Sequence, residues 1–218
     1  MFSKLLHAAE ANGFTRVPGH KHRCVERDRG FITNTVCVDR DRHDRGIVHP
    51  KLLLNIRDRF YSPRELVVVL VGFLHEDRVA VLGYAQPREW REKDEDTAVE
   101  AFIQHGLPWF DTYSSLEVLV ERLERELRDG VVPDPVDEAS LRWERFLLRR
   151  SAPKKRPRPP INHYYLSLLY DEMGDQARAC HHCQEYLLFV SDGQHESTVR
   201  RREHAQRQLR EMGCAPTA

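Results

Sequence analysis

The sequence predicts an α+β fold, in which an antiparallel sheet is covered by helices and followed by a small all-α helical-hairpin tail. Alternating and β-branched segments crowd the first 85 residues, and helical periodicity replaces them from Asp96 onward. Four prolines within 151–160 then interrupt the helical pattern, beside four cations. The expected domains are therefore an α+β domain at 1–150, a Pro/Arg-rich linker at 151–160 and a helical tail at 161–218.

The first half of the chain is expected to hold one helix and the strands. The helix covers 2–12, and Gly13 fits the left-handed position just past its end. A polar connection is expected at 39–50. Strands are predicted where residues alternate or are β-branched, namely at 22–27, 31–38, 52–60 and 78–85.

Residues 62–75 carry two conflicting signals. Ser62, Pro63 and Glu65 are typical of a helix start, as N-cap, first helical residue and capping-box acid. The β-branched run from Val67 to Val71 instead prefers a buried strand. We favour the strand and leave the helix open.

Helical signals dominate the second half. One helix is expected over 97–105, and another begins after Ser114, whose capping box with Glu117 precedes a stripe of leucines that Gly130 ends. Asp134 opens a third helix. In the tail, helices are predicted over 164–173, 175–190 and 197–212.

Composition and sequence pattern exclude several classes of protein. No stretch approaches the roughly 20 apolar residues that a membrane span requires. Five cysteines are too few and too irregularly spaced for a disulfide scaffold, and the amino-terminal segment lacks the pattern of a secretory signal. We therefore expect a cytoplasmic protein with reduced thiols, no membrane partner and no cofactor.

The formal net charge of zero hides an uneven distribution. Residues 89–138 hold 15 acidic and 5 basic side chains, which suits a basic partner protein, with Glu121 and Glu124 as candidate contacts. Trp109 and Phe110 are candidates for an exposed recognition spot, because aromatic anchors dominate interface energies. The alternative is that both aromatic side chains close the hydrophobic core.

A basic stretch supplies an alternative function. Its cations could contact a phosphate backbone, whereas the prolines among them also fit a solvated linker. The net charge of zero weakens the nucleic-acid interpretation. The candidate contacts are Arg149, Arg150, Lys154, Lys155, Arg156 and Arg158.

One pair of cysteines has metal-binding chemistry. Cys180 and Cys183 have a spacing common among zinc ligands, with His204 and Cys214 as further candidates. Both cysteines also lie inside a predicted helix, where packing explains them, and we favour packing.

A polar segment carries a second group of possible ligands. Carboxylate and imidazole groups could hold a divalent ion there. The alternating Asp–Arg order instead suggests charges that are neutralised within a solvated loop, and we favour that interpretation. The residues are Asp39, Asp41, His43, Asp44 and His49.

No catalytic constellation emerges from the sequence. It contains no G-x-S-x-G, no phosphate-cradling glycine loop and no H-E-x-x-H. Cys37 fits a strand position, and His105 fits a helix end. The sequence therefore favours a protein without enzymatic activity and leaves an enzyme open.

Two segments resemble known families. The first combines Gly13-Phe14-Thr15-Arg16 after an opening helix with Trp90, an acidic stretch and Gly106-Leu107-Pro108-Trp109-Phe110. This pattern resembles a widespread bacterial domain of unknown function, over 1–130 and most clearly over 88–127. The resemblance implies a small α+β domain without established catalytic residues. Some relatives in that family are suspected of neutralising bacterial toxins, which implies an immunity-like role.

The second segment, at 166–186, resembles a tetratricopeptide hairpin. Leu166 and Tyr170 match the inward positions of its first helix, Gly174-Asp175 its turn, and Ala179 the small residue at the close helix crossing. One repeat and a following helix fit, whereas free-standing arrays need about three repeats. The resemblance implies a short adaptor, or a tail that docks on the first domain.

These observations together predict a protein-binding module without enzymatic activity, which acts by stoichiometric binding as an immunity-like or adaptor protein. One alternative is contact with nucleic acid through residues 142–158. The other is a metal-dependent protein that uses Cys180 and Cys183.

Overall fold

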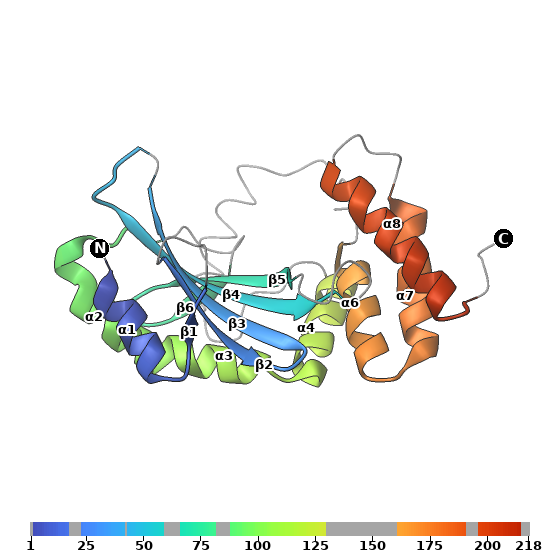
Figure 1. Ribbon diagram of the computed structural model, residues 1–218, viewed down its shortest axis with the longest axis horizontal. Helices are drawn as coiled ribbons and strands as arrows, with labels where there is room; N and C mark the ends of the chain where they lie inside the picture. Colours follow the sequence, from blue (N-terminus) through green and yellow to red (C-terminus); the bar gives the residue numbers. More distant parts are fainter. Residues whose placement is uncertain are drawn as a thin grey trace. The chain divides into compact units, whose positions relative to one another are not determined.

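The computed structural model divides into two compact units, which are described separately below (Figure 1). The structure describes residues 2–17, 23–41, 43–58, 66–81, 88–129, 161–190 and 196–214. Within them, unit 1 comes from Met1–Arg57 and Leu66–Ser115, and unit 2 from Asp58, 116–129 and the residues after 160. The predicted linker at 151–160 and the helix expected after Asp134 lie outside the described residues.

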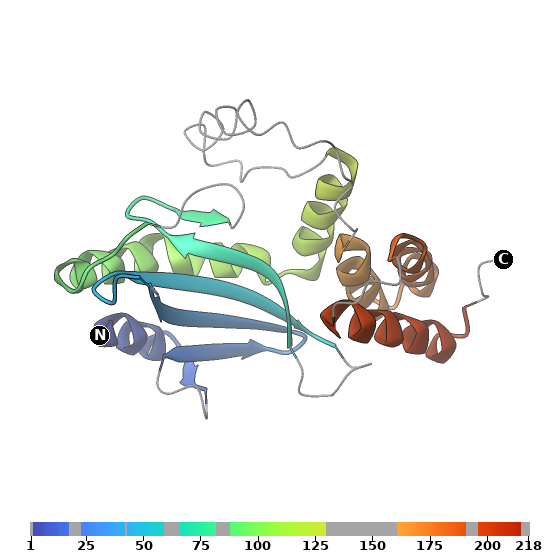
Figure 2. The same cartoon turned by 90° about the horizontal axis from the view of Figure 1, so that it is seen from above.

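Unit 1 is built on a six-stranded antiparallel sheet whose strand order follows the sequence. Each strand pairs with the next one along the chain, so the sheet is a succession of hairpins (Figure 2). Together with the helices, this confirms the predicted α+β class. The strands are β1 (Thr15–Arg16), β2 (Cys24–Arg29), β3 (Ile32–Arg40), β4 (Val48–Arg57), β5 (Leu66–Leu74) and β6 (Val79–Val81).

The β3–β4 hairpin is longer than the sequence indicates. Asp39 pairs with His49 and Arg40 with Val48, so the polar connection predicted at 39–50 shrinks to residues 41–47. Pro50 lies inside β4, opposite Val38. The prediction was wrong here because polar side chains that cap and pair along a hairpin look, in sequence, like a loop.

β5 settles the conflict at 62–75 for the residues that are described. Leu66–Leu74 is a strand, as the β-branched run favours, and it pairs with both β4 and β6. A register shift between Leu54 and Asn55 marks a bulge in the pairing of β4 with β5. The helix-start signals at 62–65 lie outside the described residues.

One face of the sheet is covered by helices α1 (Ser3–Ala11), α2 (Glu95–Ala101) and α3 (Leu107–Tyr113) (Figure 1). Alternation along β3 and β4 sends a buried apolar set to this face, including Ile32, Val36, Leu52 and Ile56. Burial of such side chains contributes roughly 1.5–3 kcal/mol each. In this layer the centre of the Phe14 ring lies 6.2 Å from that of Phe102 and 5.6 Å from that of Phe110.

A π-helical turn, η2 (Phe102–Gly106), joins α2 to α3. Leu107 N–H donates to the carbonyl of Phe102, five residues back, and Pro108 has no N–H to offer the α-helical pattern. Gly106 is required because a Cβ there would lie 2.6 Å from the Phe102 ring and 3.4 Å from Leu52. The helix predicted at 97–105 is confirmed, and the helical path continues through the Gly-Leu-Pro-Trp-Phe segment into α3.

Unit 2 is a group of helices around a central one. The helices are α4 (Leu116–Asp129), α6 (Ile161–Glu172), α7 (Gln176–Phe189) and α8 (Glu196–Glu211). Seven consecutive residues of α6, from Tyr164 to Tyr170, are buried, because α4, α7 and α8 all contact this helix. The sequence assigned the helix after Ser114 to the first domain, and its contacts are with α6.

The hairpin of α6 and α7 has the packing expected from the tetratricopeptide resemblance. Gly174 takes a left-handed φ of 77° at the turn, and Asp175 caps α7 by accepting from the N–H of Arg178 at 3.0 Å. The residues at the predicted inward positions are all buried. They are Leu166, Tyr170 and Ala179, and Cys183 and Tyr186 of α7 are buried as well. Membership of that family stays a prediction.

Among the residues that the structure describes, no helix has the length and apolar character needed to cross a membrane.

Candidate functional site

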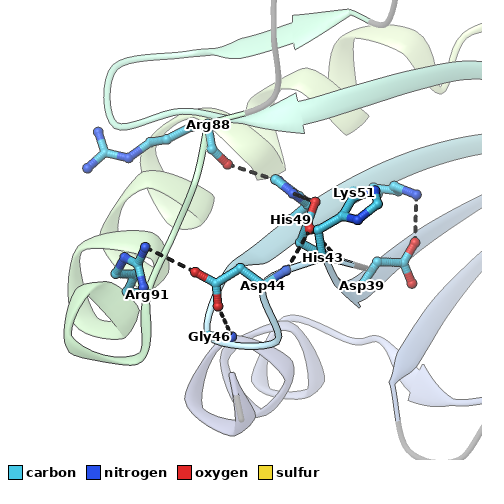
Figure 3. Close-up of polar contacts among 9 residues, drawn as sticks. Asp39, His43, Asp44, Gly46, His49, Lys51, Arg88 and Arg91 are labelled. Carbon is cyan, nitrogen blue, oxygen red and sulfur yellow. Dashed lines mark hydrogen bonds and ion pairs between the residues drawn. The ribbon is translucent and has the colours of Figure 1, made fainter.

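The polar residues singled out in the sequence meet at the closed end of the β3–β4 hairpin (Figure 3). Asp39, near the end of β3, accepts a hydrogen bond from Lys51 of β4 at 2.6 Å. His49 lies opposite Asp39 in the strand register. Pairing of the two strands thus brings residues ten or more positions apart to one end of the sheet.

Asp41 organises the connection between the two strands. Its carboxylate accepts from the backbone N–H groups of His43 at 2.7 Å and Asp44 at 3.0 Å, and it lies 3.5 Å from Nε2 of His49. The hydrogen bonds from the Asp44 and His43 amides lower the pKa of Asp41, because they stabilise its charged form. Asp41 is therefore a turn-forming residue in the manner of an Asx turn.

Asp44 is neutralised from outside the hairpin. It accepts from the N–H of Gly46 at 2.8 Å, and it pairs with Arg91 at 3.3 Å (Figure 3). Within the described part of the chain, no group of three or more His, Cys, Asp or Glu side chains is arranged to hold a metal ion. Of the two interpretations of the polar segment, self-neutralised charges fit this geometry.

Trp90 anchors the segment that brings Arg91 to the hairpin. Trp90 forms an isolated antiparallel bridge with Val48, and its indole N–H donates to the carbonyl of Leu74 at 2.8 Å. The Arg88 guanidinium stacks over the Trp90 ring at 4.3 Å, and the Arg88 carbonyl lies 3.2 Å from Nδ1 of His49. These contacts hold the segment from Arg88 to Arg91 against the end of the hairpin. The polar groups there bind one another, which is a structural role.

Trp109 and Phe110 lie in the core. Phe110 is fully buried, and Trp109 packs its ring 5.3 Å from Phe110 and 5.4 Å from Tyr113. A Cβ on Gly72 would lie 3.3 Å from the Trp109 ring, so this glycine makes room for the indole. Of the two sequence-based alternatives, the core position is the one that the structure shows, and neither residue forms an exposed anchor.

The acidic candidates on α4 are neutralised within unit 2. Glu121 forms an ion pair with Arg125 one turn later. Glu124 accepts a short hydrogen bond from the hydroxyl of Tyr170, which also accepts from Arg178 at 3.2 Å. Glu126 pairs with Arg122 at 3.1 Å. The basic candidates from Arg149 to Arg158 lie outside the described residues.

A different acidic surface lies on unit 1. We call it the α2–η2 stripe, defined by Asp96, Glu100 and Ile103, which are all exposed on the side of these helices away from the core. Ile103 leaves 48% of its surface exposed. Asp96 pairs with Lys4 at 2.7 Å, but both side chains are exposed, so the pair contributes little and leaves Asp96 available. Leu107, one turn on, is half-buried.

Four of the five cysteines are paired, which contradicts the expectation of reduced thiols. Cys24 and Cys37 lie opposite each other on β2 and β3 and form one disulfide. Cys180 and Cys214 form the other. A sulfur held in a disulfide cannot act as a thiolate ligand. Because Cys180 is bonded to Cys214, the interpretation of Cys180 and Cys183 as a metal-binding pair is wrong for the disulfide-bonded chain.

Comparisons of the chain with protein-family models, curated proteins and solved structures find no match. The two family resemblances stay predictions.

Unit 2 holds two polar clusters that the sequence did not reveal. In the first, Nδ1 of His163 lies 2.8 Å from Nδ1 of His182, whose ring stacks on Tyr170 at 5.5 Å. Burial lowers the pKa of His182 to about 4, with a further contribution from the facing His163, and burial also lowers the pKa of His163. The hydrogen bond between the rings requires at least one unprotonated nitrogen, so the neutral pair fits this packing.

The second cluster joins Asp58, Tyr164 and His204. Asp58 is 1% exposed and accepts a short hydrogen bond from the Tyr164 hydroxyl. Nδ1 of His204 lies 3.4 Å from the same carboxylate and 3.5 Å from the Tyr164 oxygen. Burial, with the adjacent carboxylate, raises the pKa of Tyr164. These groups lie far apart in sequence and carry no local motif, so only the fold could bring them together.

Proposed function

We propose that this chain works by stoichiometric binding of another protein, with the α2–η2 stripe as its contact surface. The partner that fits is a protein presenting an apolar pocket surrounded by basic side chains. The proposed function is the protein binding expected from the sequence, but the contact residues differ. The sequence named Glu121, Glu124, Trp109 and Phe110, whereas the stripe lies elsewhere in the acidic segment 89–138.

The exposure of Ile103 beside two exposed carboxylates is the observation that supports the proposal most. A branched apolar side chain gains by leaving water, and Leu107 beside it extends the apolar area. Asp96 and Glu100 flank it on the amino-terminal side, and like charges there would repel an acidic partner. In the described part of the chain, Glu100 has no ion-pair partner, so its charge is available to a cation.

The π-turn under the stripe adds a second line of support. Single π-turns inside α-helices occur frequently at functional sites. Here the turn keeps Phe102 in the core while Ile103, its neighbour, points to solvent. Because Gly106 and Pro108 fix this turn, the stripe is presented on a rigid element rather than on a loop.

Partner capture with matched variants tests the proposal. The full chain is captured with its associated proteins from its native host, and the associated proteins are quantified by mass spectrometry. We expect one partner at near-stoichiometric amount, lost at least tenfold from the double variant Glu100→Lys, Ile103→Asp. Val199→Asp is the matched control, because Val199 is 43% exposed on α8, and it should retain the partner.

Two results would contradict the proposal. One is the absence of a stoichiometric partner in repeated captures, and the other is a partner that both the stripe variant and the control retain equally. Binding to nucleic acid through residues 142–158 is the alternative. It would appear as salt-dependent DNA or RNA binding whose salt slope falls when Lys154, Lys155, Arg156 and Arg158 become serine.

A further inference from the structure

Helix α8 is held by contacts that are mostly polar. Among its residues whose burial the structure describes, from Val199 to Glu211, the buried ones are His204, Ala205 and Gln208, and Met212 is buried just past its end. A set of this composition buries little apolar area, so the hydrophobic effect stabilises its docking only weakly. This sets α8 apart from α6, which is buried over seven consecutive residues.

The individual contacts of α8 are ones that water can replace. The Gln208 amide donates to the Ser167 carbonyl at 3.1 Å, and the Ser167 hydroxyl donates to Gln208 at 3.0 Å. The Cys183 thiol donates to the Ala205 carbonyl at 3.1 Å. Such bonds contribute modestly because the open state regains them from solvent.

A covalent bond secures the carboxy-terminal end of the helix. Cys214 follows Gly213, whose left-handed φ of 67° ends α8, and its N–H donates back to the Leu209 carbonyl at 3.0 Å. Its sulfur is bonded to Cys180 in the second turn of α7. Position 214 is thus fixed both to α8 and to α7, and the bond closes a loop across 34 residues.

We propose that the Cys180–Cys214 disulfide is a reducible latch that keeps the carboxy-terminal half of α8, from Ala205 to Cys214, docked over Cys183. A dithiol reductant opens it. One thiolate of the reductant attacks one sulfur of the disulfide and forms a mixed disulfide, while the Cys180–Cys214 bond breaks and the other protein sulfur leaves as a thiolate that takes a proton from water. The second thiolate then displaces the protein sulfur, which leaves two protein thiols and one oxidised dithiol, with two electrons transferred to the protein.

Cys183 is the group that the latch conceals. It is fully buried, and burial raises the pKa of its thiol to about 12, so it does not attack the neighbouring disulfide itself. The amino-terminal half of α8 keeps a separate anchor, because His204 lies against Asp58 and Tyr164. Reduction therefore frees one half of the helix and leaves the other half in place.

Alkylation of Cys183 with iodoacetamide, followed by peptide mass spectrometry, tests the latch on the full chain. We expect Cys183 in the double variant Cys180→Ser, Cys214→Ser to react at least tenfold faster than in the oxidised wild type. The wild type treated with dithiothreitol should match the variant. The matched control, Cys24→Ser with Cys37→Ser, removes the other disulfide and should leave the Cys183 rate at the wild-type value.

Hydrogen exchange on the same samples distinguishes a latch from a general structural bond. Faster exchange confined to residues 205–214, with α6 still protected, supports the latch. Equal Cys183 rates in all samples would overturn it. Loss of protection throughout α6 and α7 in the double variant would also overturn it, because unit 2 would then need the disulfide to fold.

Discussion

The β3–β4 hairpin and helix α8 are held in place by opposite means. Leu52, Leu54 and Ile56 of β4 are fully buried in an apolar layer, and their strand has hydrogen-bonded neighbours on both sides. Helix α8 instead docks through Gln208, His204, a small alanine and a disulfide. Apolar packing keeps the β3–β4 hairpin in place under varied conditions. The docking of α8 rests on polar contacts and a disulfide, so it depends on conditions such as pH and reduction.

Deleting apolar volume in the hairpin should have the largest effect. Leu52→Ala removes a fully buried side chain that lies between Val36, Gly72 and Gly106, and the close packing leaves little room to collapse. We expect a loss of about 4 kcal/mol in the free energy of unfolding, measured by urea denaturation. The control Val68→Ala, at a 40% exposed position of β5, should cost about 0.5 kcal/mol. Equal costs would show that the apolar layer is not what holds the sheet.

Removing the buried carboxylate of unit 2 should come next. Asp58→Ala leaves the Tyr164 hydroxyl and His204 without their shared acceptor. Because both groups are buried, we expect a loss of about 3 kcal/mol, measured by hydrogen exchange of α6 and α8 amides. Asp171→Ala, on the same α6 helix and half-exposed, is the comparison variant. If the amides of α6 and α8 exchange hydrogen at the same rate in both variants, the buried cluster does not stabilise unit 2.

Acidification should weaken unit 2 through the His163–His182 pair. Unfolded histidine has a pKa near 6.5, and His182 in the folded protein has a pKa of about 4, so the unfolded state takes up the proton first as the pH falls. The contribution of His182 to stability is therefore complete above pH 6.5 and is lost between pH 6.5 and 4. The lowered pKa of His163 acts in the same direction. The ionisable groups around the pair are Glu124, Arg178, His181 and Glu185.

Chemical denaturation between pH 7.5 and 4 measures this effect. The variant His182→Gln should flatten the pH dependence, because it removes the titrating group while keeping a polar side chain. His181→Gln, at the exposed neighbouring position, should leave the dependence as in the wild type. If the free energy of unfolding of the wild type rises as the pH falls from 6.5 to 4, the stabilising role of the neutral His182 is contradicted.

The smallest effects are expected on α4. Glu124→Gln weakens a charge-assisted hydrogen bond from Tyr170 and should cost about 1 kcal/mol in the free energy of unfolding. Glu121→Gln breaks an exposed pair with Arg125 and should cost less than about 0.5 kcal/mol. Thermal unfolding of the two variants in parallel measures the difference, and a larger cost for Glu121→Gln would reverse the order of the two sites.

The local elements of the fold could be predicted because their signals are short-range. Alternation predicted most of β3, and Gly13 and Gly174 were correctly placed at the end of α1 and at the turn before α7, since left-handed backbone positions favour glycine. Predictions failed where long-range pairing decided the outcome. Asp39 and Arg40, which the sequence placed in a polar connection, are strand residues because of their partners on β4.

The candidate sites were harder to predict than the fold. A sequence shows that Asp41 and Asp44 are acidic, but only the hairpin shows that backbone amides and Arg91 neutralise them. Cys180 was matched to Cys183 by spacing, whereas its bonded partner is Cys214, 34 residues away. The Asp58, Tyr164 and His204 cluster spans three separate segments, so no local pattern could have found it.

Residue-resolved hydrogen exchange on the oxidised and the dithiothreitol-reduced full chain tests the contrast between apolar and polar docking most directly. We predict that amides of β4 exchange slowest and equally in both states, and that amides of residues 205–214 exchange at least tenfold faster after reduction. Unchanged exchange of residues 205–214, or faster exchange of β4 than of α8 in either state, would contradict the account.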